Sequence, residues 1–542
     1  MKSASFDKRK LWMASSALIL IIIALVAFFL ASSTFSPPAP ATQTTKAANV
    51  PLGPMGIVNG LSCCYGPWVA GSSVVIDPPP GMPFQDPLEM QDINPDPNVV
   101  ECNVEAKMAE VNINGVMAYL HTYNGAYPAP TIRFKRGDLL KIHFKNNLVT
   151  TGEEVNMLGF QTDVVNIHTH GLHVSPNEPS DHPDIAIEPG KSYEYEYNTS
   201  MASEDSLNFY HSHVHGRTAE MYDIGGCMIS EGDEAPSVEG YETHILFIKD
   251  IAIVDGQRAP YLSIAEYVVG KEGNIVMVNG QVNPVLNIQP GEVQRWRIVN
   301  ACNARFLLLS LQGHSINLIG SDSDMLDKPY SMPEILLTPS ERADVLVKAD
   351  QTPGSYKLLA LPYNSGCGGS VPQTVTLMTV NYAGEAVNDQ LPSVVEPDEV
   401  RLNVDLSNVV YRRFVLSMGM GRGYINGMDF DVNPMTITSK VNTYEVWDVS
   451  SQCMMDHVFH IHINDFQVLG ITGGYPGYSL FTQIPAYKDS VLVPRGGTVR
   501  LLVRVRDFTG MTMFHCHIVE HEDIGMMGNW MIEPNGASMA MG

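Results

Sequence analysis

Positive charge is scarce in this chain of 542 residues. Lysine and arginine number 33 against 58 aspartates and glutamates, which gives a formal net charge of −25. That balance excludes nucleic acid and anionic membrane surfaces as partners. Charged residues of both signs make up only 17% of the chain and hydrophobic residues 44%, so an intrinsically disordered chain is also excluded. A folded chain of this length divides into about two to four domains.

Cysteine is also sparse, and its spacing excludes a recognisable disulfide framework. The eight cysteines are scattered between Cys63 and Cys516, and their pairing cannot be read from the sequence. Long helical periodicity is scarce beyond residue 31, which disfavours an α-helical fold.

The N-terminus carries a long apolar run without charge. Lys8, Arg9 and Lys10 precede residues 11–31, which are long enough to span a bilayer with the basic side in the cytoplasm. We expect residues 1–32 to be a membrane anchor or a cleaved signal segment, and the rest to be exported to the periplasm or cell surface. Residues 33–98 are rich in proline and glycine, which predicts an extended tether or a segment draped over the protein, and a plain spacer is the favoured interpretation.

The rest of the chain has the residue pattern of β-strands. Short alternating runs broken by a turn recur at PTIRFKRGDLLKIHFKNNL (130–148), PVLNIQPGEVQRWRIVN (284–300) and NPMTITSKVNTYEVWDVS (433–450). Three such units predict an all-β chain of three Greek-key β-sandwiches. We place the sandwich domains at residues 99–240, 241–397 and 398–542.

Four histidine clusters lie in the first and third of these units. They are HTHG (168–171), HSH (211–213), HVFHIH (457–462) and HCHIVEH (515–521), and they hold ten of the 17 histidines. A single His-x-His pair is often two side chains on a solvated strand. Four such clusters in one β protein indicate metal ligands.

Strand geometry divides these side chains between two sites. Neighbouring side chains on a strand point to opposite faces, so each His-x-His pair shares a face, while Cys516 and His457 point the other way. One site gathers eight histidines: His168, His170, His211, His213, His460, His462, His515 and His517. The other combines Cys516, His457 and His521 with a methionine, for which Met526 is favoured over the adjacent Met527. This ligand set is typical of blue copper, whereas eight histidines suit several coppers.

These motifs, in this order and spacing, resemble those of the multicopper oxidases, which include laccases, bilirubin oxidases and bacterial cuprous oxidases. The resemblance covers residues 100–535 and implies three cupredoxin domains with four coppers. It implies that His168 and His460 hold type 2 copper and that His457, Cys516, His521 and Met526 hold type 1 copper. The type 3 pair would then be held by His170, His211 and His517 on one copper and by His213, His462 and His515 on the other.

The resemblance also implies proton-relay acids and a partner, O₂. Electrons from a reductant would pass through Cys516 to the cluster, where O₂ is reduced to water. Glu522 and Asp181 match the acids that supply protons in family members, and a solvated loop carboxylate is the alternative for each. Thr169 departs from the family, many of whose members have tryptophan there. It should point away from the cluster.

The reductant is left open by the sequence. Cys453, Met454 and Met455 precede His457, and soft sulfur ligands favour Cu(I), which suits a cuprous oxidase. A phenol-oxidising laccase would instead need an open apolar cleft beside His457. A non-catalytic copper-binding or scaffold protein is the alternative from another class, although no cluster ligand is missing.

Overall fold

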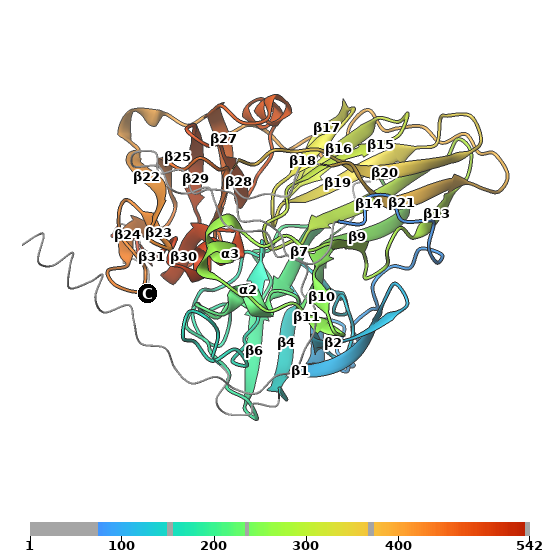
Figure 1. The fold of residues 1–542 in the computed structure, drawn as a ribbon. Helices are drawn as coiled ribbons and strands as arrows, with labels where there is room; N and C mark the ends of the chain where they lie inside the picture. Colours follow the sequence, from blue (N-terminus) through green and yellow to red (C-terminus); the bar gives the residue numbers. More distant parts are fainter. Residues whose placement is uncertain (1–73, 149–154, 233–237, 323, 367–372, 537–542) are drawn as a thin grey trace, which may run out of the picture. The chain divides into compact units, whose positions relative to one another are not determined.

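The computed structural model describes residues 74–148, 155–232, 238–322, 324–366 and 373–536. Within these ranges the chain forms mostly β-strands, which hydrogen-bond into six sheets (Figure 1). Two sheets belong to each of three successive segments, so the prediction of an all-β fold with three sandwiches is confirmed. The domain boundaries near residues 240 and 397 stay a prediction.

The first sandwich has sheets of order β10-β11-β2-β1-β4-β6 and β3-β8-β7-β5. Strands β10 and β11 follow residue 240 in sequence, so the next segment lends a short hairpin to this sheet. The bounds are β1 Val99–Ile113, β2 Val116–Tyr123, β3 Ile132–Lys135, β4 Leu139–Asn146, β5 His168–His170, β6 Ser192–Asn198, β7 Ser206–His211, β8 Gly225–Glu231, β10 Ile253–Val254 and β11 Gln257–Arg258, with helix α2 Thr218–Met221.

The second sandwich has sheets of order β12-β9-β14-β19-β16-β17 and β13-β21-β20-β15-β18. The bounds are β9 Glu242–Ile251, β12 Ile275–Val278, β13 Val285–Ile288, β14 Val293–Asn300, β15 Leu307–Leu311, β16 Ile316–Ser321, β17 Asp324–Met332, β18 Ile335–Leu337, β19 Arg342–Lys348, β20 Ser355–Leu361 and β21 Val375–Tyr382, with helix α3 Ile264–Val269.

The third sandwich has sheets of order β23-β22-β25-β29-β27 and β24-β31-β30-β26-β28. The bounds are β22 Val410–Gly419, β23 Arg422–Ile425, β24 Met435–Lys440, β25 Thr443–Ser451, β26 His457–Ile461, β27 Asp465–Thr472, β28 Ser490–Val493, β29 Thr498–Val505, β30 Gly510–Cys516 and β31 Met527–Glu533, with helix α4 Val519–Asp523 and short 3₁₀ turns at Leu406–Asn408 and Pro476–Thr482.

The three strand–turn–strand units seen in the sequence occupy equivalent places in the three sandwiches. The first strand of each, β3, β13 or β24, pairs in parallel with the last long strand of its sandwich. The second strand, β4, β14 or β25, pairs in parallel with the first long strand, in the opposite sheet. Each unit therefore crosses from one sheet to the other, and the three segments are copies of one topology.

Side-chain alternation explains which strands border the core. In β4 the buried positions are Leu140, Ile142, Phe144 and Asn146, and the intervening residues are half-buried. This is the period of a strand with one face on a core. Every residue of β14 is buried, because it lies inside its sheet between β9 and β19 and both faces are covered.

The second half of the proline-rich extension packs against the sandwiches. Pro83 forms a parallel bridge with Val285, and Glu89 forms one with Thr131. Interpreting this extension as a plain spacer is therefore wrong for residues 74–98, because its backbone groups bond to two sandwiches. Among the described residues no helix is long and apolar enough to cross a membrane, and the predicted anchor at residues 11–31 lies outside them.

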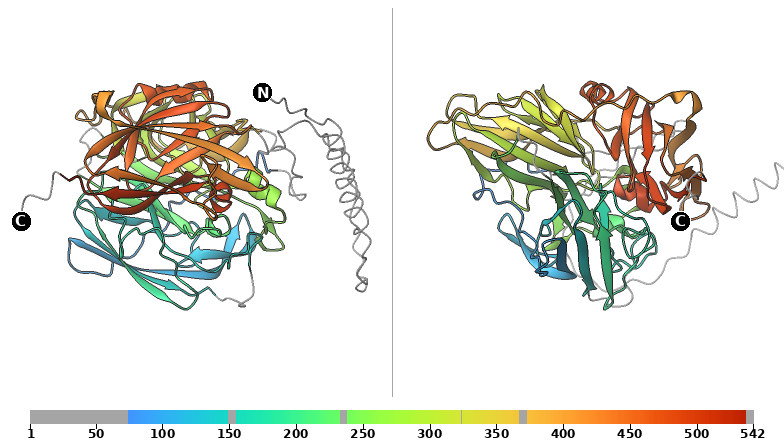
Figure 2. Two further views of the ribbon diagram at one scale, coloured as in Figure 1. Left: turned by 90° about the vertical axis from the view of Figure 1, so that its left-hand side faces the viewer. Right: turned by 180° about the vertical axis from the view of Figure 1, so that it is seen from behind.

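Residues from all three sandwiches share one apolar cluster where they meet. Phe209 from β7, Phe247 from β9 and Val519 from α4 belong to it. Figure 2 gives two further views of the fold, coloured along the sequence. Helix α4, which follows the HCH motif directly, is thereby held at the junction, and strands of the first and third sandwiches place their histidines beside it.

Candidate metal centres

Eight buried histidines gather between the first and third sandwiches. Strand β5 pairs with β7, so that His168 lies opposite His211, and β26 pairs with β30, so that His460 lies opposite His515. The rings of His168 and His462 stack with centroids 4.0 Å apart, and those of His170 and His460 with centroids 3.8 Å apart. The structure thus brings together the eight that the sequence assigns to one site: His168, His170, His211, His213, His460, His462, His515 and His517.

The unpartnered ring nitrogens of these histidines indicate metal ligation. His168, His211 and His460 each have the Nδ1 engaged by an oxygen, while the buried Nε2 has no partner. His517 has neither nitrogen engaged. Buried polar atoms are normally hydrogen-bonded, so a set of converging unpartnered imidazole nitrogens requires an explanation. Metal ligation supplies it, with the oxygens acting as the partners that fix the tautomer.

A subset of three histidines defines one ion position closely. The Nε2 atom of His515 lies 3.1 Å from Nε2 of His213 and 3.0 Å from Nε2 of His462. Burial, reinforced by the neighbouring imidazoles, lowers the pKa of all three rings well below the usual value. They are therefore neutral at physiological pH, the state in which imidazole binds a metal.

The second candidate centre lies on the opposite face of β30. The Sγ atom of Cys516 is 3.5 Å from Nδ1 of both His457 and His521, and those two nitrogens are 3.2 Å apart. All three side chains are fully buried. Burial raises the pKa of the Cys516 thiol to about 12, so binding a soft metal here must displace a proton.

Met526 lies beside this centre. It is buried in the same apolar cluster as Cys516, its N–H donates to the His521 carbonyl at 2.9 Å, and its carbonyl accepts from the Cys516 N–H at 3.0 Å. The neighbouring Met527 begins β31 and pairs with His515. Two imidazoles, a thiolate and a thioether form the donor set of blue copper, and they fit that metal.

Comparison with known proteins agrees with this geometry. Residues 105–234, 251–385 and 396–536 each match a family model described as multicopper oxidase. A multicopper oxidase of Staphylococcus aureus is 30% identical over 416 residues, which cover 75% of this chain and 82% of that protein. The chain belongs to the multicopper oxidase family.

More distant relatives extend the comparison. A Bacillus subtilis laccase is 25% identical over 507 residues, covering 82% of this oxidase and 96% of the laccase. A solved structure described as a multicopper oxidase from Campylobacter jejuni, a metallo-oxidase, shares the fold with a TM-score of 0.72. It is 24% identical and covers 86% of this chain and 99% of its own.

Family membership and the two centres together define the activity. The oxidase binds four coppers and couples one-electron oxidation of a reductant at the type 1 copper to reduction of O₂ to water at the trinuclear cluster. The alternative of a non-catalytic copper-binding scaffold finds no support.

Both acids proposed from the sequence lie against the histidine cluster. Glu522 is fully buried, and its Oε1 accepts from the Thr218 hydroxyl at 2.9 Å and lies 3.6 Å from His213 Nε2. Its Oε2 lies 3.4 Å from His515 Nδ1. Burial raises the pKa of Glu522 to about 8, so the carboxyl group is mostly protonated at neutral pH.

Asp181 contacts the cluster differently. Its carboxylate accepts from His168 Nδ1 at 2.9 Å and from the Thr169 N–H at 2.9 Å. Burial would raise the pKa of Asp181, but these two partners outweigh it and lower the pKa. Asp181 is thus an anion that holds the His168 ring in one tautomer.

Two further buried residues, which the sequence does not predict as part of the site, lie beside the cluster. Asp489 accepts from His170 Nε2 at 3.1 Å, and Arg342 from the second sandwich pairs with Asp489 at 2.6 Å. Asp489 belongs to no histidine cluster, and Arg342 is in a segment without ligands. A charged Lys488-Asp489 pair directly before an apolar strand was the only signal in the sequence.

The remaining histidines lie away from the ligand positions. His173 Nε2 contacts Asp507 at 2.7 Å, and His215 Nε2 contacts Asp431 at 2.6 Å. His244 and His314 bond to Asp86 and Tyr382. Each of these four rings thus contacts a side chain other than those of the two candidate centres.

Proposed function

We propose the following copper ligands for the oxidase. Type 1 copper is held by His457, Cys516, His521 and Met526, and type 2 copper by His168 and His460. One type 3 copper is held by His170, His211 and His517, and the other by His213, His462 and His515. The unpartnered nitrogens support this assignment, because they belong to buried histidine rings that are grouped closely together. Glu522 supplies protons at the cluster, and Asp181 fixes His168.

We further propose that the physiological reductant is small, with Cu(I) favoured over bulky phenols. This proposal rests on the burial of the two type 1 histidines. His521 Nε2 donates to the Val268 carbonyl of α3 at 3.1 Å, and both His457 and His521 are fully buried. A phenol ring therefore cannot reach either imidazole edge directly.

Thioethers near His457 support the same choice. Met454 is 50% exposed only three residues before His457, whereas Cys453 and Met455 are buried. The Asp456 carboxylate is not available to a cation, because it accepts from the Tyr363 hydroxyl at 2.7 Å and the Arg495 N–H at 2.8 Å. A soft sulfur at the surface suits Cu(I).

Oxygen uptake tests this choice of reductant. The copper-loaded oxidase should consume O₂ faster with Cu(I) than with 2,6-dimethoxyphenol, and Met454→Leu should lower only the Cu(I) rate. Met82→Leu is the matched control, since Met82 is 72% exposed on the N-terminal extension. A faster rate with the phenol, unaffected by Met454→Leu, would identify the protein as laccase-like.

We also propose that the oxidase works outside the cytoplasm, anchored by residues 11–31. The proposal rests on the apolar run that follows three basic residues. Fractionation of cells expressing the full chain should place it in the membrane fraction. Deletion of residues 11–31 should leave it in the cytoplasm.

A further inference from the structure

Asp489 lies in the third sandwich and contacts two histidines of the cluster. It lies just before β28, is almost fully buried, and its Oδ1 accepts from His170 Nε2 at 3.1 Å and from the Ser490 hydroxyl at 2.9 Å. Its backbone carbonyl accepts from His460 Nδ1 at 3.0 Å. One residue thus contacts histidines that come from the first and the third sandwich.

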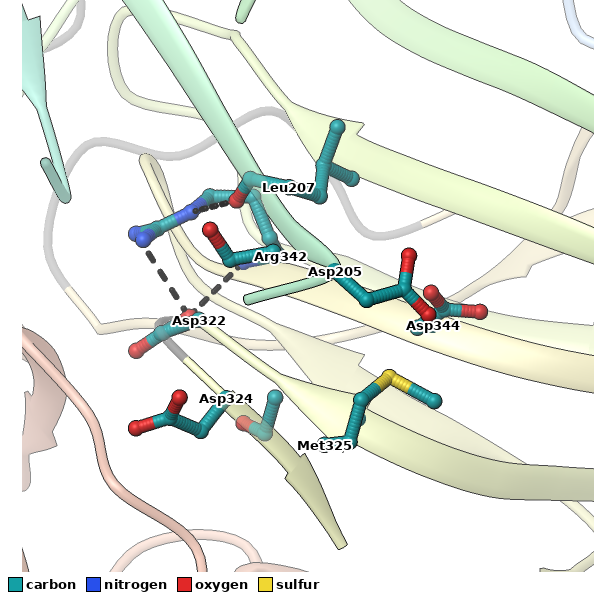
Figure 3. A pocket seen from close by; sticks show the side chains of 10 residues that line it. Asp205, Leu207, Asp322, Asp324, Met325, Arg342 and Asp344 are labelled. Carbon is teal, nitrogen blue, oxygen red and sulfur yellow. Dashed lines mark hydrogen bonds and ion pairs between the residues drawn. The ribbon is translucent and has the colours of Figure 1, made fainter. Parts of the chain in front are cut away.

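Arg342 completes this contact from the second sandwich, which supplies no copper ligand. Its Nη1 and Nη2 donate to the two carboxylate oxygens of Asp489 at 2.8 and 2.6 Å. Its Nε donates to the Leu207 carbonyl at 3.1 Å, and Nη1 lies 3.6 Å from Asp322 (Figure 3). The guanidinium is therefore fixed by groups of all three sandwiches.

Gly171 leaves the space that this arginine occupies. It directly follows His170, and a Cβ added to it would lie 2.2 Å from Arg342 Nη2, far inside van der Waals contact. The glycine of the HTHG motif thus allows the guanidinium to pass beside the ligand strand. The backbone of Gly171 also has a φ of +88°, which favours glycine.

His170 has its two ring nitrogens reversed relative to its neighbours. His168, His211 and His460 have the Nδ1 engaged and the Nε2 without a partner. In His170 the Nε2 contacts Asp489 and the Nδ1 has no partner. A neutral imidazole carries one proton, so an acceptor at Nε2 leaves the Nδ1 lone pair for a metal.

We propose that Arg342 and Asp489 are positioning residues that set His170 to bind its copper through Nδ1. The carboxylate holds the proton on Nε2, and the arginine keeps the carboxylate buried, charged and correctly turned. The ligand-free middle sandwich thereby controls the coordination of the cluster. This inference rests on the proposed assignment of His170 to a type 3 copper.

An Asp489→Asn variant should place a hydrogen-bond donor, instead of an acceptor, opposite His170 Nε2. Arg342 has only N–H donors, so it draws the single amide oxygen of the new side chain toward itself. The amide NH₂ then faces His170 Nε2, the ring proton moves to Nδ1, and the nitrogen facing the copper is blocked. Changing a residue that hydrogen-bonds to a metal ligand weakens metal binding about 10- to 100-fold.

The double variant Arg342→Met/Asp489→Asn tests whether the Asp489→Asn effect comes from the orientation of the His170 hydrogen bond or from a general loss of packing. It removes the guanidinium and leaves no unpaired buried charge. The amide is then free to turn its oxygen to His170, so cluster copper should return. Arg295→Lys is the control, since Arg295 is an equally buried arginine that pairs with Asp344 at 2.6 Å and Asp205 at 2.8 Å, and none of the three ligates copper.

The experiment measures copper per chain, the EPR spectrum and the blue absorption of full-length, copper-loaded protein. We expect Asp489→Asn to lose cluster copper and gain EPR-detectable type 3 copper with an unchanged blue band. The double variant should recover, and Arg295→Lys should lower only the melting temperature. Wild-type copper content and spectra in Asp489→Asn would overturn the inference, as would a double variant no better than the single one or an Arg295→Lys variant with the same copper loss.

The outcomes also separate this inference from the function on which it rests. Wild-type protein that binds no cluster copper would overturn the proposed ligand assignment and the positioning role together. Wild-type protein with four coppers and an unaltered Asp489→Asn variant would overturn the positioning role alone.

Discussion

Replacement of Glu522 by glutamine should slow the reaction with O₂ without disturbing copper. The carboxyl lies 3.4 Å from His515 Nδ1 and 3.6 Å from His213 Nε2, and burial raises its pKa to about 8. It therefore carries a proton at neutral pH beside the place where O₂ is reduced. Glutamine has the same shape and keeps an oxygen for the Thr218 hydroxyl, but it cannot release a proton.

The expected magnitude follows from the role of a positioned acid. General acid catalysis contributes about 10²- to 10⁴-fold, so we expect oxygen uptake to fall at least about 100-fold. That loss corresponds to about 2.7 kcal/mol of transition-state stabilisation, because each tenfold in rate is about 1.36 kcal/mol. Thermal stability should change little, since no hydrogen bond of the Glu522 side chain is lost.

Stopped-flow kinetics separates the two half-reactions. Anaerobic bleaching of the blue band by the reductant should proceed at the wild-type rate, and its return on mixing with O₂ should be slow. Glu520→Gln is the matched control, because Glu520 is equally buried on α4 but accepts from the Tyr261 hydroxyl at 2.7 Å and the Lys271 N–H at 2.9 Å. Reoxidation of Glu522→Gln at the wild-type rate would refute the reasoning.

Three further predictions concern the type 1 centre, the glycine beside the cluster and the pH dependence of stability. Cys516→Ser should abolish the blue absorption and oxygen uptake while three coppers per chain remain, as measured by metal analysis, because serine supplies no thiolate. Gly171→Ala should lower the free energy of unfolding by about 1–3 kcal/mol in urea titration, since its Cβ would meet Arg342 Nη2 at 2.2 Å; an unchanged unfolding midpoint would contradict the close contact. Burial raises the pKa of Asp324 to about 6 and that of Glu399 to about 8, so the folded protein holds protons that the unfolded chain has released. Their contribution to stability is full below about pH 4 and is lost as pH rises through about 8, and Glu399→Gln should flatten this slope in unfolding measured at pH 5, 7 and 9.

Local patterns were sufficient to predict the strands and the division of the ligands. Alternation and turns located β3 with β4, β13 with β14, and β24 with β25, because each strand has one face on a core. The two-residue spacing of the histidines placed each pair together, and the opposite orientation of Cys516 separated a second centre from the first. Both deductions need only the geometry of a single strand.

Contacts between residues of different sandwiches could not be predicted from local sequence patterns. Asp489 and Arg342 are 147 residues apart, and neither belongs to a motif. The hydrogen bond from His521 to Val268 joins residues 253 apart and decides that α3 covers the type 1 histidine. The packing of residues 74–98 against two sandwiches is likewise a set of long-range backbone contacts that composition does not encode.

From the sequence alone, strand period predicts the fold class, the order and spacing of the four motifs point to the family, and side-chain chemistry predicts the donor atoms. The folded protein is needed to see which ring nitrogen of each histidine is left free, which acids lie within reach of the cluster, and what covers the type 1 centre. Those properties depend on contacts a few ångströms long between segments far apart in the chain. Such contacts exist only once three separate sandwiches have packed around one junction.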